Sequence, residues 1–176
     1  DVLGVSTQIS SPMLTVVRNV TRNETQQAEC PIGHWCTAGA TIPCVEGTFS
    51  NATNLTSPDE CSACVAGHFC VSGSAAPEAC PAGRFGADER LSNAQCSGAC
   101  KAGHYCPAGS TNRTARLCPA GTFNPASGST TAEACQPCGK GGFCAAGSAG
   151  PAACAAGRYG DSDGREGCTQ IQARTS

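Results

Sequence analysis

One short motif recurs eight times in this chain: a cysteine is followed three residues later by glycine and five residues later by an aromatic residue. The copies begin at Cys30, Cys44, Cys64, Cys80, Cys100, Cys118, Cys138 and Cys154. They contain every aromatic residue of the protein and all three of its histidines. Self-similarity of this kind is the signature of a repeat array. The chain is therefore expected to fold as a series of small units.

The cysteine content indicates that covalent bridges replace a hydrophobic core. Sixteen of 176 residues are cysteine, about nine per cent, which is typical of disulfide scaffolds. After Cys30 the aliphatic residues are mostly alanine, and burial at about 25 cal/mol per Å² would not offset the chain entropy. A native bridge contributes about 2–4 kcal/mol. An even number of regularly spaced cysteines implies an oxidising compartment, so we expect an extracellular or cell-surface protein.

The cysteines form four groups of four. Within a group the first gap is always five residues, the second is 7, 9, 11 or 9, and the third is 16, 15, 16 or 13. Constant gaps indicate the framework and variable gaps indicate surface loops. The predicted division is an N-terminal segment 1–29, four repeats at 30–63, 64–99, 100–137 and 138–168, and a tail 169–176.

Each repeat has two halves that begin alike. The motif glycine is expected to take a positive-φ turn that lays the following aromatic ring over the disulfide of its own cysteine. Frequent glycine and proline exclude long regular elements. The predicted fold class is small and disulfide-rich: a tandem array of four short β-hairpin modules forming an elongated rod, with almost no helix.

Residues 1–29 contain no cysteine and have a different pattern. Leu14, Val16 and Val20 alternate with Thr15, Val17, Asn19 and Thr21, which predicts a strand. We expect this strand to have no partner strand of its own.

The repeated residues resemble a known class of module. Cys118-Pro-Ala-Gly-Thr-Phe-Asn, Cys135-Gln-Pro-Cys and Cys106-Pro-Ala-Gly-Ser look like ephrin-receptor-like cysteine-rich repeats, which are distantly similar to tumour-necrosis-factor-receptor and EGF-like modules. The resemblance covers residues 30–168. It implies an extracellular, stalk-like array of the kind found in surface proteins of algae and protists and in flagellar hair (mastigoneme) subunits. The fourth repeat departs from it, with Cys138-Gly-Lys-Gly and Cys154-Ala-Ala-Gly.

The spacing alone leaves three pairings open for each repeat. The resemblance to receptor modules implies that the first cysteine of each repeat joins the second and the third joins the fourth. The implied bridges are Cys30–Cys36, Cys44–Cys61, Cys64–Cys70, Cys80–Cys96, Cys100–Cys106, Cys118–Cys135, Cys138–Cys144 and Cys154–Cys168. The rival scheme joins first to third and second to fourth.

Two patterns are compatible with metal or redox chemistry. Cys61-x-x-Cys64 and Cys135-x-x-Cys138 have zinc-ribbon or thioredoxin spacing, but in a periodic framework they are the end of one module and the start of the next. His34, His68 and His104 occupy one equivalent position. Because copies lie a whole module apart, we expect turn-surface histidines with local hydrogen bonds and no metal site.

The sequence predicts no enzyme and no cofactor. A nucleophile needs a base within reach, whereas the cysteines are assigned to bridges and the acids lie in variable loops: Asp59, Glu60, Asp88, Glu89, Asp161, Asp163 and Glu166. Asp161-Ser-Asp163-Gly lacks the remaining ligand spacing of a calcium loop. A net charge of −2 with scattered arginines provides no nucleic-acid patch, and no apolar run reaches the roughly 20 residues of a membrane span.

Five Asn-x-Ser/Thr sequons occur, at Asn19, Asn23, Asn51, Asn54 and Asn112. In a secreted chain such asparagines are acceptors for covalent N-glycans. Asn51 and Asn54 fall in the first long loop, and Asn112 falls in the longest loop between second and third cysteines. We therefore expect a glycoprotein whose sugars lie on the loops.

Two functions fit these features. The first is a structural subunit of an extracellular glycoprotein filament or cell-surface coat, with copies joined head to tail when the N-terminal strand adds to a neighbour's sheet edge. The alternative is a stalk or ligand-binding ectodomain of a surface receptor or adhesion protein, which predicts a monomer with one exposed face free of glycans.

Overall fold

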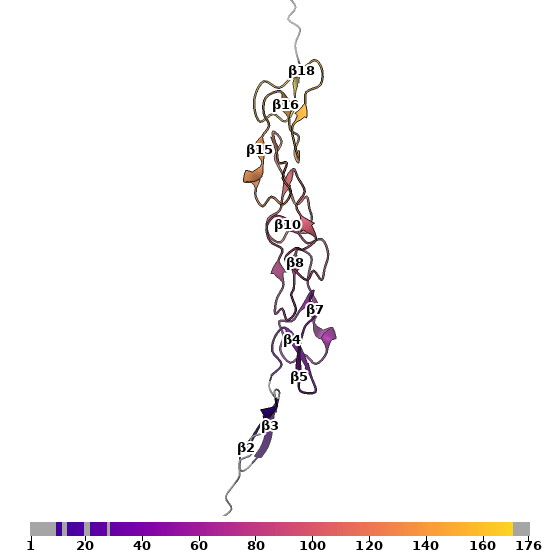
Figure 1. The fold of residues 1–176 in the computed structure, drawn as a ribbon, viewed down its shortest axis with the longest axis vertical. Coiled ribbons are helices and arrows are strands. Elements are labelled where there is room, and N and C mark those ends of the chain that lie inside the picture. Colours follow the sequence, from indigo (N-terminus) through magenta and orange to yellow (C-terminus); the bar gives the residue numbers. More distant parts are fainter. Residues whose placement is uncertain (1–9, 12–13, 20–21, 28, 171–176) are drawn as a thin grey trace, which may run out of the picture. The chain divides into compact units, whose positions relative to one another are not determined.

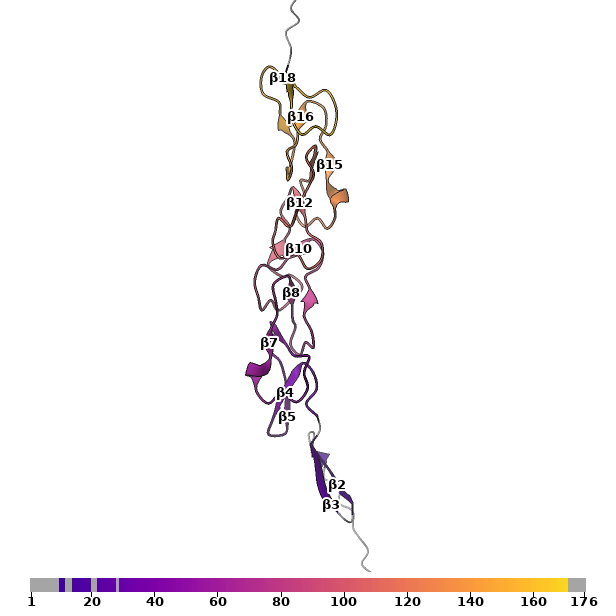
Figure 2. The same ribbon diagram turned by 180° about the vertical axis from the view of Figure 1, so that it is seen from behind.

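The computed structural model describes residues 10–11, 14–19, 22–27 and 29–170. By its internal contacts the chain divides into two units. The first contains Asp1–Cys64 with Cys70–Pro77, and the second contains Val65–Phe69 with Glu78–Ser176. In both views the ribbon consists mostly of turns, with strands as short arrows (Figure 1, Figure 2). The described residues contain only two helical turns, both 3-10, at Pro58–Glu60 (η1) and Ala132–Ala134 (η2), and no helix suited to crossing a bilayer.

Each copy of the motif forms one antiparallel hairpin, so the small disulfide-rich fold with tandem hairpins is confirmed. In the first seven copies, the aromatic and the residue before it pair with the two residues that precede the next motif cysteine; in the eighth, they pair with the two residues that follow Cys168. The hairpins are β4 His34–Thr37 with β5 Ala40–Pro43, β6 Thr48–Phe49 with β7 Ser62–Ala63, β8 His68–Phe69 with β9 Glu78–Ala79, β10 Arg84–Phe85 with β11 Gly98–Ala99, β12 His104–Tyr105 with β13 Arg116–Leu117, β14 Thr122–Phe123 with β15 Gln136–Pro137, β16 Gly142–Phe143 with β17 Ala152–Ala153, and β18 Arg158–Tyr159 with β19 Thr169–Gln170. We call the segment from one motif cysteine to the residue before the next a half-module, numbered one to eight.

The motif glycine turns the chain into each hairpin, as predicted. All eight motif glycines have φ between 75° and 85°, a region that side-chain-bearing residues enter only at a cost. The residue after the glycine closes the turn by donating its N–H to the carbonyl three positions earlier, as Thr48 does to Val45 at 3.0 Å. A fixed local turn thus places every aromatic residue at the same point of its half-module.

Eight disulfides stabilise the half-modules. The bridges are Cys30–Cys36, Cys44–Cys61, Cys64–Cys70, Cys80–Cys96, Cys100–Cys106, Cys118–Cys135, Cys138–Cys144 and Cys154–Cys168. These are the partners that the resemblance to receptor modules implied. The Cα–Cα distances, from 5.6 to 6.1 Å, lie in the range of native bridges.

Main-chain hydrogen bonds join each half-module to the next. The motif glycine donates its N–H to the carbonyl that follows the next aromatic, as in Gly47 to Cys70 (2.8 Å) within the first unit and Gly103 to Asn124 (2.7 Å) within the second. The same bond recurs for Gly33, Gly67, Gly83, Gly121 and Gly141. Since these bonds use no side chains, stacking tolerates wide variation in the loops.

A second set of bonds comes from left-handed residues in six of the eight loops. Gly73 donates its N–H to the Cys44 carbonyl at 2.9 Å, and Gly128, Gly147 and Gly164 do the same to the motif cysteine of the preceding half-module. Asn54 makes the equivalent bond to Cys30 with φ 63° although it is not glycine. Main-chain groups of the loops therefore take a direct part in stacking the half-modules.

The loop carbonyls also approach the motif glycine two half-modules earlier. A Cβ on Gly33 would lie 2.2 Å from the Gly73 carbonyl oxygen, and a Cβ on Gly103 would lie 2.1 Å from that of Gly147. Real Cβ atoms do not come this close. At Gly33, Gly67, Gly83, Gly103 and Gly121 the motif position thus requires glycine for two reasons, its φ and this contact.

The buried interior consists mainly of the bridges themselves. The motif cysteines from Cys44 to Cys138 have no exposed surface. Trp35 packs against the cluster of Cys44, Leu55 and Cys61, so this ring covers the bridge of the following half-module. Its main-chain bridge partner Leu55 belongs to that half-module as well.

Asn124 is the largest fully buried side chain of the described residues, at 2% exposure. Its Nδ2 donates to Ser129 Oγ at 2.7 Å and to the His104 carbonyl at 3.4 Å, and its Oδ1 accepts from the Ala126 N–H at 3.0 Å. The equivalent residue in half-module two, Ser50, accepts from the Ala52 N–H with its hydroxyl at 3.1 Å. A small polar side chain is thus used twice to close the same loop.

Asn124→Ala is expected to lower the free energy of unfolding by about 2–3 kcal/mol, because it removes the partner of the buried His104 carbonyl and of the half-buried Ser129 hydroxyl. Asn124→Ser is the matched control, since serine makes the loop bond at the equivalent position, and it is expected to recover about half of the loss. Chemical denaturation of the oxidised protein measures both. Equal stability of the Ala variant and the native chain would contradict the assignment.

The N-terminal segment contains a small antiparallel sheet. Strand β2, Leu14–Asn19, is central and pairs with β1, Ser10–Ser11, and with β3, Arg22–Gln27, from Leu14↔Gln27 to Asn19↔Arg22. The predicted strand is present, although Val20 and Thr21 lie outside the described residues. The prediction that it has no partner strand was wrong. β3 contains only polar residues, and main-chain pairing requires no apolar alternation.

Candidate functional site

The sequon loops are the candidate functional sites. Asn19 ends β2 and Asn23 lies in β3, where it pairs with Arg18. Asn51 and Asn54 follow β6 and are exposed, and Asn112 is exposed in the turn between β12 and β13. The structure thus places the three sequons that follow Cys30 on loops.

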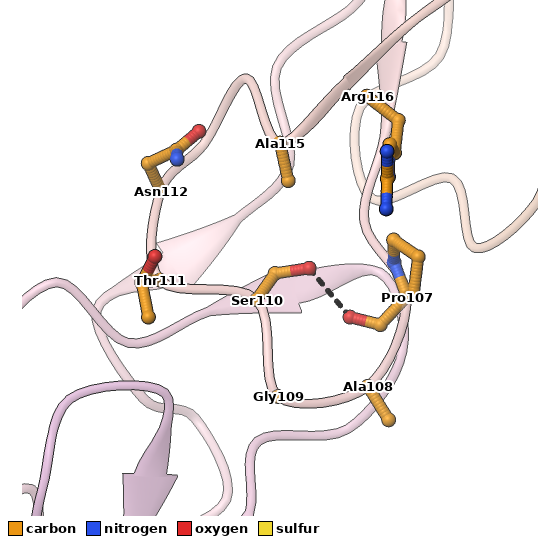
Figure 3. Close-up of a pocket in the computed structure, with 8 residues that line it drawn as sticks. All are labelled: Pro107, Ala108, Gly109, Ser110, Thr111, Asn112, Ala115 and Arg116. Atoms are coloured by element: carbon orange, nitrogen blue, oxygen red, sulfur yellow. Dashed lines mark hydrogen bonds between the residues drawn. The ribbon is translucent and has the colours of Figure 1, made fainter.

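Asn112 lies in an open loop that leaves its amide accessible. Its Oδ1 accepts from both the N–H (3.0 Å) and the hydroxyl (3.2 Å) of Thr114, the third residue of the sequon. The loop lines a hollow of about 320 Å³, and Ser110 Oγ donates to the Pro107 carbonyl at its base. Figure 3 shows Asn112 on the side of this loop opposite Pro107 and Arg116. This local turn fixes the carbonyl side of the amide and leaves its nitrogen free for modification.

Asn54 serves the fold in a way that Asn112 does not. Its main chain occupies the left-handed loop position, and its Oδ1 accepts from the Cys30 N–H at 3.0 Å. The middle residue of its sequon, Leu55, is buried at 5% exposure. The asparagine is tolerated where other loops have glycine because asparagine enters the left-handed region more readily than most residues.

The third residue of that sequon is also engaged. Glu60 Oε1 accepts from the hydroxyl of Thr56 at 2.8 Å and from its N–H at 3.1 Å. The Thr56 hydroxyl, followed by the main-chain N–H, holds the pKa of the Glu60 carboxyl below its ordinary value. The carboxylate therefore stays charged in mildly acidic solution and keeps the hydroxyl occupied.

Asn112 is expected to carry an N-glycan on most secreted molecules, and Asn54 on a minority. Folding buries Leu55 and engages the exposed Thr56 hydroxyl with Glu60, whereas the Asn112 sequon stays in an exposed loop with no buried member. Mass spectrometry of peptides after enzymatic deglycosylation measures the occupancy at each site. Replacing Cys44 and Cys61 together by Ser releases the loop that carries Asn54, so occupancy should rise there and stay constant at Asn112. Full occupancy of Asn54 in the native chain would contradict this ranking.

The three histidines make the local hydrogen bonds that were predicted. Nδ1 lies 3.0 Å from the carbonyl two residues earlier in His34 and His104, and 3.3 Å in His68. His104 is buried at 6% exposure, not on the turn surface. A Cβ on Gly147 would lie 3.6 Å from its ring. This ring packs beneath a loop two half-modules on.

The other candidate groups are engaged in local contacts. The cysteines of each Cys-x-x-Cys pair belong to different bridges. Asp161 forms an ion pair with Arg165 at 2.6 Å, and Asp88 accepts from Ser97 at 3.2 Å. In the part of the chain that the structure describes, no three His, Cys, Asp or Glu side chains converge on a point where a metal ion could bind.

The left-handed loop position was recognised in the sequence only as a second glycine that follows the second cysteine of each repeat, and its counterpart in the other half of each repeat was missed. It falls four residues after the aromatic in odd-numbered half-modules (Gly39, Gly73, Gly109, Gly147) and five residues after it in even-numbered ones (Asn54, Arg90, Gly128, Gly164). Asn54 and Arg90 hide the period because they are not glycine. In comparisons with known proteins, the chain matches no family model and no curated sequence.

Proposed function

We propose that this chain is a structural subunit of an extracellular glycoprotein filament or cell-surface coat. The observation that carries the proposal is the repetition of one set of main-chain bonds and one bridge in successive half-modules. An array built in this way keeps its backbone ordered with little apolar burial, as a load-bearing extracellular element requires.

The loop chemistry supports the same function. The loops vary in length without changing the bridges, and the Asn112 loop presents an acceptor asparagine to solvent. Glycans on such loops would solubilise the array and protect it from proteases without disturbing the main-chain bonds. The eight bridges are typical of proteins that fold in an oxidising compartment.

The N-terminal segment cannot join a neighbouring subunit through an unpaired strand, as the sequence had suggested, so another kind of contact is required. β2 is paired on both sides, so only an outer edge of the three-stranded sheet is open to a further strand. Edge addition of this kind is a common way for extracellular subunits to join. The added strand would pair with the outer edge of the polar strand β3, which contains the sequon asparagine Asn23.

Light scattering and electron microscopy of the purified, oxidised protein test the proposal. We expect assemblies whose mass rises with protein concentration and filaments or sheets in micrographs. A variant lacking residues 1–28 separates the routes: loss of assemblies supports the N-terminal edge, and their persistence assigns assembly to the repeats. A strictly monomeric native protein at high concentration would refute the subunit role and favour the stalk of a surface receptor.

A further inference from the structure

The interface between successive half-modules has a fixed set of donors and acceptors. In each half-module the N–H of the motif glycine donates to the carbonyl of the residue that follows the aromatic in the next half-module. In return, the left-handed loop residue of that next half-module donates its N–H to the motif cysteine carbonyl of the first. A third bond runs from the N–H after the aromatic to the carbonyl that follows the left-handed residue, as from Asn124 to Ser148 at 3.1 Å. All three bonds are present in six of the seven steps, and the step from half-module three to four has the first of them, from Gly67 to Gly86.

Half-module eight presents the same groups without partners. Among the described residues, nothing accepts from the Gly157 N–H and nothing donates to the Cys154 carbonyl. Gly141 and Gly157 are exposed, whereas the six preceding motif glycines are buried. A Cβ on Gly157 would meet no described atom within 4 Å. Tyr159 is 43% exposed. Half-module eight therefore exposes the same donor and acceptor groups that are paired between half-modules in the interior.

Half-module one presents the complementary groups. The Cys36 N–H donates to Leu55, so the Cys36 carbonyl also points away from β5 and has no partner among the described residues. Gly39 lies four residues after Trp35 with φ 87°, which matches the left-handed position of the other odd-numbered half-modules. No described acceptor lies opposite its N–H. The Cys36 carbonyl is thus an acceptor of the kind that the Gly157 N–H lacks, and the Gly39 N–H is a donor of the kind that the Cys154 carbonyl lacks.

We infer that copies of this chain stack head to tail, with half-module eight of one copy on half-module one of the next. This inference rests on the proposed function and names its contact surface. The Gly157 N–H donates to the Cys36 carbonyl of the second copy, and the Gly39 N–H of that copy donates to the Cys154 carbonyl. The repeat thus continues across the boundary between chains with the bonds used inside each chain.

The boundary between copies is weaker than an interior step. Ala38 and Gly39 form a two-residue turn between Thr37 and Ala40, which are paired in the hairpin. The flanking pair of such a turn uses its own main-chain groups, so Ala40 cannot accept the third bond. The contact between copies has two main-chain bonds where six of the seven interior steps have three. It is therefore reversible and depends on protein concentration.

Hydrogen exchange of the full oxidised chain at several concentrations tests the stack directly. We expect the amides of Gly157 and Gly39 to slow together, on the order of tenfold, as the mass measured by light scattering rises. Gly157→Ala places a methyl group where a loop carbonyl of the second copy would lie, and it should remove both the protection and the mass increase. Gly164→Ala is the matched control, because its φ is also positive and a Cβ there would meet no described atom within 4 Å. Its N–H donates to the Cys138 carbonyl of half-module seven, so it lies away from the end surface of half-module eight that would bind the second copy.

The outcomes separate this contact from the proposed function. Assemblies that form while Gly157 exchanges fast, or that survive Gly157→Ala, overturn the head-to-tail contact and leave the subunit role intact. Protection of Gly157 that is independent of concentration overturns the contact as well, because a part of the same chain then covers this surface. A monomer at all concentrations overturns both.

Discussion

Reduction of the eight disulfides is expected to unfold the whole array at room temperature without denaturant. In the chain-entropy description, a bridge that closes six residues contributes about 2 kcal/mol, and one that closes 17 contributes about 3 kcal/mol. The four short and four long bridges together contribute about 20 kcal/mol, which exceeds the about 5–15 kcal/mol stability of ordinary domains. Little apolar burial remains to compensate, since the buried apolar residues are chiefly the cysteines.

The measurement is amide hydrogen exchange before and after reduction at constant pH. Alkylating the oxidised protein is the control for the reagents, and it should change nothing because no described cysteine is free. We expect protection to vanish first for the amides that donate between half-modules, such as those of Gly47 and Gly103. Retention of most protection in the reduced, alkylated chain would show that the main-chain bonds suffice without the bridges.

Gly103→Ala is expected to destabilise the second unit by about 3–5 kcal/mol, near the upper end for single substitutions. The Cβ would lie 2.1 Å from the Gly147 carbonyl oxygen, which belongs to a loop held by its own hydrogen bond to Cys118. The carbonyl cannot withdraw without breaking that bond. Strain at positive φ adds about 1–2 kcal/mol.

Gly157→Ala isolates the two effects. Gly157 occupies the same motif position with φ 81°, against 79° for Gly103, but a Cβ there would meet no atom of the described residues within 4 Å. The free energy of unfolding of this variant should fall only by the cost of a side chain at positive φ, about 1–2 kcal/mol. Thermal or chemical unfolding of the dilute oxidised proteins gives both values. Equal losses would mean that the close approach of the loop carbonyl costs nothing.

The elements governed by local chemistry were predictable from the sequence. The motif glycines adopt the positive φ that their spacing indicated, and the hairpins follow from the turn that they create. The cysteine partners match those implied by the resemblance to receptor modules. In each case the determining residues lie within one repeat, so the pattern contains the required information.

The contacts between half-modules were not predictable, because main-chain groups make them. Nothing in the identity of Ser74 or Gly128 indicates that its carbonyl or N–H reaches a neighbouring half-module. Strand β3 was missed for the same reason, since its polar residues pair through the backbone alone. Among the candidate sites, the sequons were found from their spacing, but the structural role of Asn54 depends on the distant Cys30 N–H.

The pairing of the bridges also limits how far the chain can lengthen under tension. Every bridge closes its own segment, so a pulling force runs across the cysteine pair and bypasses the residues between them. A taut path from Cys30 to Cys168 measures roughly 220 Å with the bridges intact and roughly 480 Å without them, at about 3.5 Å per residue. The oxidised array therefore stops extending at the shorter length, whereas the reduced chain can be pulled to roughly twice that length.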